Sequence, residues 1–214
     1  MSEYLIPTHR VETEIMVVNS RFIATLGPVF SAEEAREFIA DVRRQYPDAT
    51  HHVPAYQIGY GSSIITHCSD DGEPSGTSGR PVLSVIQGSG LGDIIAVITR
   101  YFGGTKLGTG GLVRAYSDAA KAGLAILPRA RKIATNTVLT ALHYTFLERA
   151  RQIARKHQGL ILDETFAADV TLCVQLPVET FEPFRLDLVE LTSGKAQVEI
   201  IETNPATILP VQEA

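Results

Sequence analysis

Apolar and polar residues alternate along two neighbouring stretches near the start of the chain, a pattern typical of half-buried strands. The stretches are VETEIMVV (11–18) and RFIATLGPVF (21–30). They predict a hairpin with a short turn at Asn19-Ser20, because both turn residues readily leave extended conformations.

Helical spacing of apolar residues predicts three helices in the same region. Ser31 and Glu34 form a capping-box pair that starts the first helix, and Pro47 ends it. A short helix follows Pro81, and a longer one begins near Leu112. Strands are expected between these helices at Val53–Tyr60, Ser62–His67 and Asp93–Phe102.

The pattern changes at LPRARK (127–132), where a proline ends the third helix and a basic stretch follows. We therefore expect two domains, 1–128 and 129–214. In the second, Thr145 and Glu148 form another capping box. Its expected elements are a strand at 134–143, a helix to about 157, strands at 160–165 and 169–176, a helix at 180–191 and a strand at 195–202.

This βαββαβ order predicts a ferredoxin-like domain, so the fold class is α+β in both halves. Pro183 must then lie in the first turn of its helix, where a missing N–H is tolerated.

Composition indicates a chain that is not disordered and argues against a generic nucleic-acid coat protein, although a local basic patch is compatible with it. Apolar residues make up 44% of the 214 residues, the net charge is −5, and neither half is basic. The start has no signal-peptide pattern, and the longest aliphatic run, IIAVI (94–98), is too short to cross a membrane. With Cys68 and Cys173 expected as buried, reduced side chains, the sequence predicts a cytoplasmic protein.

Five glycines occur between Gly103 and Gly111, just before the third helix. Each ordered glycine costs about 0.5–1 kcal/mol relative to alanine, so the run needs a geometric reason. The N–H groups at a helix start attract anions. The segment therefore predicts an anion site for a phosphate, a carboxylate or a nucleic-acid backbone.

Cations surround the glycine run. Arg100, Lys106 and Arg114 add charge, and Thr105 and Thr109 add hydroxyls. The alternative is a set of tight turns with solvated cations. Neither a Walker loop nor a dinucleotide-binding pattern is present, so ATP and NAD are not indicated.

A second loop, SDDGEPSGTSGR (69–80), is rich in oxygen ligands that Mg²⁺ prefers. These ligands are Asp70, Asp71, Glu73, Ser75, Thr77 and Ser78. The alternative, which we favour, is that its acids pair with Arg80, Arg100 or Arg114. His51 and His52 begin a strand and point to opposite faces, so one of them, with His51 as the candidate, can join the site.

Two long motifs resemble the IMPACT family, also called the YigZ-type family. They are DDGEPSGTSGRPVL (70–83) and RYFGGTKLGTGGLVRAYSDA (100–119), with weaker support from SRFIA (20–24) and DATHH (48–52). Ser78, where alanine is commoner, and His52-Val53 depart mildly from the family pattern.

The resemblance implies a first domain similar to a small-subunit ribosomal protein and to the fourth domain of elongation factor G. It implies a second, ferredoxin-like domain similar to that factor's fifth. It also implies a translation-linked binding module rather than a settled enzyme. Its binding patch would map to Arg80, Arg100, Gly103, Gly104, Lys106, Gly108, Gly110, Gly111 and Arg114.

The leading hypothesis is therefore a regulatory protein that binds RNA, the ribosome or a protein of the translation machinery, with no required cofactor. One alternative is an enzyme for a small anionic phosphoester or peptide, assisted by a metal at Asp70, Asp71 and Glu73. Another is a protein–protein adaptor that docks a partner on the open face of the C-terminal sheet.

Overall fold

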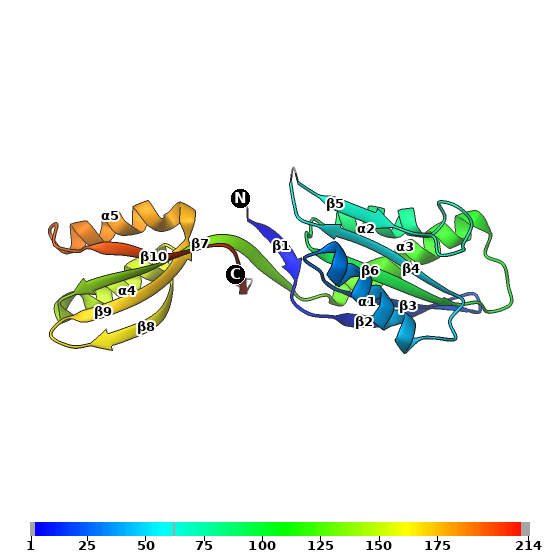
Figure 1. The fold of residues 1–214 in the computed structure, drawn as a ribbon, viewed down its shortest axis with the longest axis horizontal. Helices are drawn as coiled ribbons and strands as arrows, with labels where there is room; N and C mark the ends of the chain where they lie inside the picture. Colours follow the sequence, from blue (N-terminus) through cyan, green and yellow to red (C-terminus); the bar gives the residue numbers. More distant parts are fainter. Residues whose placement is uncertain (1–2, 62, 211–214) are drawn as a thin grey trace. The chain divides into compact units, whose positions relative to one another are not determined.

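The computed structural model describes residues 3–61 and 63–210, which fold into two compact units. The first runs from Tyr4 to Arg131 and the second from Lys132 to Leu209. The strand β7 (Arg129–Leu142) begins in the first unit and continues into the second. Each unit combines helices with a sheet (Figure 1), which confirms the expected two-domain α+β class.

A five-stranded sheet in the order β2-β3-β6-β4-β5 forms the base of the first unit, and its pairings are antiparallel. The strands are β2 (Val11–Val17), β3 (Ser20–Pro28), β4 (His51–Ile58), β5 (Ile65–Cys68) and β6 (Ile94–Tyr101). The helices are α1 (Ala32–Gln45), α2 (Gly79–Gly88) and α3 (Gly108–Ile126). Ser62, at the start of one predicted strand, lies outside the described residues.

Helices cover both faces of this sheet, which explains why its central strand β6 is apolar without alternation. Ile95 and Val97 pack in the cluster that contains α1. Ile94, Ala96 and Ile98 point to the other face and pack in the larger cluster with α2 and α3 (Figure 1).

The predicted first helix is confirmed in detail, and the predicted hairpin turn is wrong by one residue. Ser31 Oγ accepts a hydrogen bond from the Glu34 N–H at 3.1 Å, which is one half of a capping box. The Glu34 carboxylate accepts from the Phe30 N–H at 2.8 Å rather than from that of Ser31. In the hairpin Val17 pairs with Ser20, so Val18 and Asn19 form the turn, and Val18 has a φ of 56°. A positive φ at the first turn position matches the twist of paired strands.

A short strand that the sequence did not indicate, β1 (Tyr4–Pro7), pairs with β7. The third helix also differs from the prediction, because α3 begins at Gly108 rather than near Leu112. Cys68 and Cys173 are free, and both are half-buried rather than buried.

The second unit has the predicted βαββαβ order. After β7 its elements are the 3₁₀ turn η1 (Tyr144–Phe146), α4 (Leu147–Lys156), β8 (Leu160–Phe166), β9 (Val170–Pro177), η2 (Val178–Thr180), α5 (Phe181–Leu191) and β10 (Val198–Pro210). Its sheet order, β10-β7-β9-β8, is that of a ferredoxin-like fold. Pro183 lies in the first turn of α5, as required.

One expectation about this unit is wrong. The helix α4 begins at Leu147 with no side-chain cap, so Thr145 and Glu148 form no capping box. Instead, His143 Nδ1 accepts from the Thr145 N–H at 3.4 Å and caps the short η1 turn. The sequence has the residues of a capping box, but the Thr145 N–H donates to His143 in the preceding turn.

Candidate anion-binding site

The connection between β6 and α3 is shorter than the glycine pattern suggested. Gly103 and Gly104 lie in this connection, whereas Gly108, Gly110 and Gly111 belong to the first turn of the helix. Gly104 and Gly108 have φ values of 82° and 70°, in the left-handed region that favours glycine. Glycine thus lets the chain leave the sheet and enter a helix within a few residues.

Gly103 allows two chain segments to approach closely. A Cβ at this position would come closer than 3.0 Å to the carbonyl oxygen of Asn19 in the β2–β3 turn. The Gly103 N–H donates to Ser20 Oγ at 3.2 Å, and the Phe102 N–H donates to Thr50 Oγ1 at 3.1 Å. These two main-chain donors therefore bind the protein itself and are not available to a ligand.

The N-terminus of α3 is different, because no side chain caps it. Leu107 is the N-cap residue and carries no acceptor. The first N–H groups of a helix lack intrahelical acceptors, and the helix dipole makes this end positive. A Cβ on Gly110 would meet nothing within 4 Å, so an oxyanion has room to approach.

Two exposed cations accompany this helix end. Lys106 precedes α3, and Arg114 follows Gly110 by four residues, on the same side of the helix. Neither forms an ion pair with any of the residues that the structure describes. We call Lys106, Gly108–Gly111 and Arg114 the α3-terminus site.

Two other predicted cations do not join this site as free charges. Arg80 lies on α2, and with Lys121 it lines a separate depression of about 470 Å³. Arg100 is only 4% exposed, and its Nη1 donates to Glu73 Oε1 at 2.5 Å. Its Nη2 donates to Ser20 Oγ at 3.2 Å. The Glu73 carboxylate therefore compensates the Arg100 charge inside the protein.

Two aromatic rings lie close to the Arg100 guanidinium. Its Cζ lies 5.4 Å from the ring centre of Phe22 and 5.5 Å from that of Phe102. Tyr116 donates its hydroxyl proton to the same Glu73 oxygen at 2.8 Å. Burial raises the pKa of the Tyr116 phenol far above its ordinary value, and the negative Glu73 adds to this effect.

The first carboxylate of the acidic loop is an internal anchor. Asp70 accepts hydrogen bonds from the N–H groups of Gly76, Ser78 and Gly79 and from Ser78 Oγ, at 2.8–3.1 Å. Burial alone would raise the pKa of Asp70, but these hydrogen bonds outweigh it and hold the pKa below its ordinary value. Asp70 thus fixes the loop to the start of α2.

The second carboxylate joins this loop to α1 and β4. Asp71 pairs with Arg43 at 2.7 Å and accepts from the His52 N–H at 2.6 Å. His51 Nδ1 lies 2.7 Å from the Asp71 carbonyl oxygen, so this nitrogen carries the proton in that hydrogen bond. His51 Nε2 lies 3.9 Å from Glu73, whereas His52 Nε2 contacts the Tyr46 carbonyl, so the two rings serve different sites.

The carboxylates of the acidic loop therefore accept hydrogen bonds from the protein itself, and each acid has different partners. Among the residues that the structure describes, no group of three or more His, Cys, Asp or Glu side chains is placed to hold a metal ion. Thr77 Oγ1 donates to the Pro74 carbonyl at 2.6 Å, and Ser75 is exposed. The Mg²⁺ expectation gains no support from this geometry.

A cavity of about 370 Å³ lies beside the α3-terminus site, and we call it the Phe102 pocket. It is lined by Glu73, Pro74, Arg100, Phe102, Lys106, Leu107, Gly108, Thr109 and Leu112. Sequence reasoning found its charged members and Thr109 but missed Phe102, Leu107 and the supporting Tyr116. Phe102 directly precedes the glycines and is 47% exposed, which no local pattern indicates.

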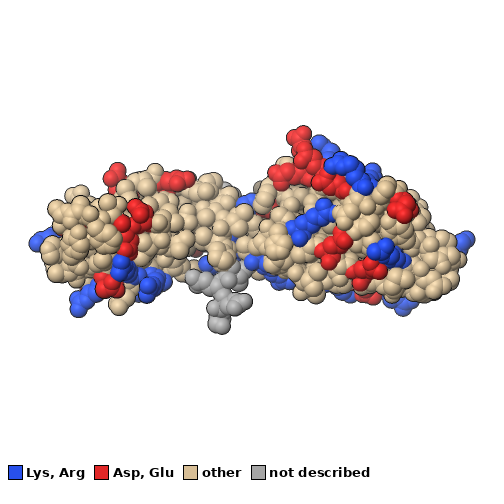
Figure 2. Space-filling view, turned by 90° about the horizontal axis from the view of Figure 1, so that it is seen from below, with Lys and Arg blue, Asp and Glu red and all other residues tan. Residues whose placement is uncertain are grey.

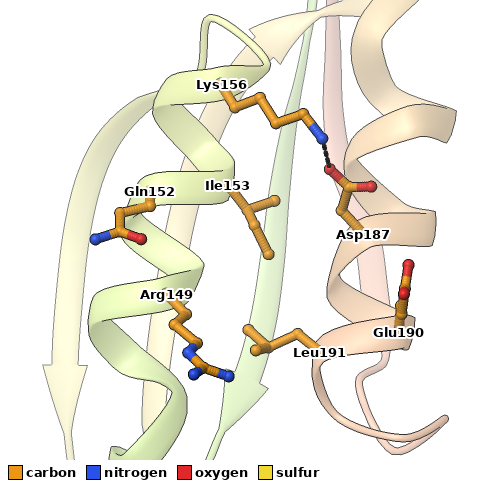
Figure 3. A pocket seen from close by; sticks show the side chains of 7 residues that line it. All are labelled: Arg149, Gln152, Ile153, Lys156, Asp187, Glu190 and Leu191. Carbon is orange, nitrogen blue, oxygen red and sulfur yellow. Dashed lines mark hydrogen bonds and ion pairs between the residues drawn. The ribbon is translucent and has the colours of Figure 1, made fainter.

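The second unit contains a larger and more open depression, of about 560 Å³, between α4 and α5 (Figure 3). Ile153 and Leu191 line it together with charged side chains from both helices. Lys156 Nζ donates to Asp187 Oδ2 at 2.7 Å, and His157 Nε2 contacts the same oxygen. The hydrogen bonds from Lys156 and His157 lower the pKa of Asp187.

The surface charge is mixed. On the face shown in Figure 2, lysine and arginine side chains lie among aspartate and glutamate side chains. No continuous basic area is visible on that face. Anion binding on this face would therefore depend on a local site rather than on a broad positive surface.

Comparison with known proteins identifies the class. Residues 18–124 match the model of the Impact N-terminal domain, and residues 140–195 match a domain of unknown function, DUF1949. The chain belongs to the IMPACT family.

Its relatives include bacterial two-domain proteins. An IMPACT family member of Haemophilus influenzae is 38% identical, over 94% of this chain and 98% of its own. YigZ of Escherichia coli is 36% identical, over 94% and 100%, and YvyE of Bacillus subtilis 37% identical, over 88% and 86%. A crystal structure of a hypothetical protein, 36% identical, covers 94% of this chain and 98% of its own, with a TM-score of 0.63.

Weaker matches add no function. Yih1, described as a two-domain translational regulator, is 22% identical over 56% of this chain and 46% of its own, with a TM-score of 0.34. A likeness this weak supports no conclusion about this chain. Among the described residues, no helix is both long enough and apolar enough to span a membrane.

Proposed function

We propose that this protein is a cytoplasmic, translation-linked regulator that binds RNA, alone or in the ribosome, through the α3-terminus site. One observation carries the proposal: the uncapped start of α3 lies between two exposed cations, Lys106 and Arg114, that have no described ion-pair partner. Phosphate oxygens are the natural ligands of such a helix end. The link to translation comes from the family resemblance, and the cytoplasmic location is the expectation drawn from two reduced cysteines.

The alternatives lack a comparable observation. An enzyme with a metal at Asp70, Asp71 and Glu73 would need carboxylates that are free to bind it, whereas these acids accept hydrogen bonds within the protein. A free cation pair beside open N–H groups instead favours reversible binding of a negatively charged chain.

Two substitutions at one position test the site. Gly110→Asp places a negative charge in the first turn of α3, which suits the helix but repels a bound phosphate. Gly110→Ala adds only a methyl group in open space and is the matched control. We expect the aspartate variant to lose RNA binding, measured by fluorescence anisotropy of a labelled single-stranded RNA, and the alanine variant to keep it.

Salt dependence provides the second readout. Lys106→Ala should weaken binding of all RNA sequences similarly and reduce the slope of log K against log salt by about one. Lys121 lies further along α3 and lines the other depression, outside the α3-terminus site. Lys121→Ala also removes one positive charge and should leave the slope unchanged. An affinity for RNA that does not change with salt, or that is unchanged in Gly110→Asp, contradicts the proposed function.

A further inference from the structure

The Phe102 pocket contains a carboxylate oxygen for which no described residue supplies a donor. The Glu73 side chain is 4% exposed, and its Oε1 receives both Arg100 and Tyr116. No described donor reaches its other oxygen, although Glu73 lines the pocket. This oxygen is not fully enclosed, because it is not one of the buried side-chain atoms that lack a partner. In the pocket it can therefore accept an N–H or O–H group of a ligand in place of water.

The pocket wall is apolar and aromatic. Phe102, Leu107, Leu112 and Pro74 line it, and Phe102 is half exposed. The Arg100 guanidinium lies on Phe102, 5.5 Å from the ring centre, and is itself held by Glu73. This support keeps the Phe102 ring in place, so the pocket offers a preformed surface for a flat, apolar group.

The charged features lie at different depths. Glu73 is almost buried, whereas Lys106 and the N–H groups at Gly108 and Thr109 stand at the exposed side. A matching ligand has an anionic group separated from an N–H donor by an apolar body. Inorganic phosphate lacks the body, a fatty acid lacks the donor, and an amino acid carries both polar groups on one carbon.

We propose that the Phe102 pocket binds a single unstacked nucleotide. Its base lies against Phe102 and donates an N–H to Glu73, and its phosphate contacts Lys106 and the start of α3. The inference deepens the proposed function and rests on it, because the phosphate contact is the same. Aromatic stacking of a splayed-out base is a general means of recognising single-stranded RNA. A cavity of about 370 Å³ is also in the size range of small-ligand pockets.

The first experiment removes the stacking surface. Phe102→Leu keeps an apolar side chain but no ring, and Phe30→Leu, at a phenylalanine of similar exposure in the same unit, is the control. Binding of a labelled eight-nucleotide RNA and of the four ribonucleoside 5′-monophosphates is measured by anisotropy and calorimetry. Phe102→Leu should weaken binding by about fivefold or more, and Phe30→Leu should leave it unchanged.

The second experiment varies the ligand, so that the protein stays intact. The best-bound nucleotide is compared with an analogue whose base N–H donors are removed or methylated. We expect the analogue to bind about tenfold more weakly, because Glu73 then stays unsatisfied. Equal binding of the two overturns the role of Glu73.

The outcomes separate this inference from the proposed function. If the affinity for RNA falls with salt but is the same in Phe102→Leu as in the parent, the proposed role of the Phe102 pocket is wrong and the proposed function stands. Mononucleotides that bind through Phe102 while RNA does not bind support the pocket and contradict the proposed function. Phe102-dependent binding of the RNA alone identifies an RNA residue, rather than a free nucleotide, as the occupant.

Discussion

The buried ion pair between Glu73 and Arg100 connects the fold to the site and is open to a direct test. Both side chains are about 95% buried, and the pair joins the acidic loop to the central strand β6. Removing one partner of such a pair costs about 3–5 kcal/mol of unfolding free energy, because the other charge stays buried without compensation. We therefore expect large losses from Glu73→Leu and from Arg100→Met.

Replacing both residues should cost far less than the two single losses together. A buried pair and an apolar pair of similar volume often differ little in stability, so the double variant should recover about 2–3 kcal/mol relative to additivity. Tyr116 also loses its acceptor when Glu73 is replaced. The cycle is therefore measured in a Tyr116→Phe background, so that it reports the ion pair alone.

Urea unfolding followed by tyrosine fluorescence suits this measurement. The chain has no tryptophan, and six of its seven tyrosines lie between Tyr4 and Tyr116, within the first unit. The exposed pair Arg21–Glu14, with a distance of 2.7 Å, is the internal control and should contribute less than about 1 kcal/mol. Additive losses at Glu73 and Arg100, or losses no larger than at Glu14 and Arg21, would refute the reasoning.

Two further predictions concern the same loops. Gly103→Ala should lower the free energy of unfolding of the first unit by about 1–3 kcal/mol, measured by urea denaturation, because the new Cβ meets the Asn19 backbone. Gly110→Ala should have no such effect, because its Cβ lies in open space. Equal stability of the two variants contradicts this prediction. Asp70 should stabilise the fold fully above its ordinary pKa of 3.8 and progressively less as pH falls toward its lowered folded value. When the free energy of unfolding is measured against pH, its fall in acid should therefore be less steep in Asp70→Asn than in the parent. Identical curves for the two proteins would contradict this prediction.

The sequence alone determined the elements that depend on neighbouring residues. The Ser31–Glu34 capping box, the continuous apolar strand that became β6, and the βαββαβ order with Pro183 in a first turn were all readable, because local hydrogen bonding and side-chain periodicity produce them. The long motifs between Asp70 and Ala119 also indicated the family, which the comparisons confirm.

Only the tertiary structure decided what each charged residue does. Arg100 pairs with Glu73, 27 positions away, and with Ser20, 80 positions away, and no local pattern encodes such contacts. No local pattern encodes the close approach of Gly103 to the Asn19 backbone either. Nor does one indicate that Lys106 and Arg80 line separate cavities. Spacing along a chain specifies which face of an element a side chain occupies, whereas packing of the layers decides whether its charge is buried against a partner or left for a ligand.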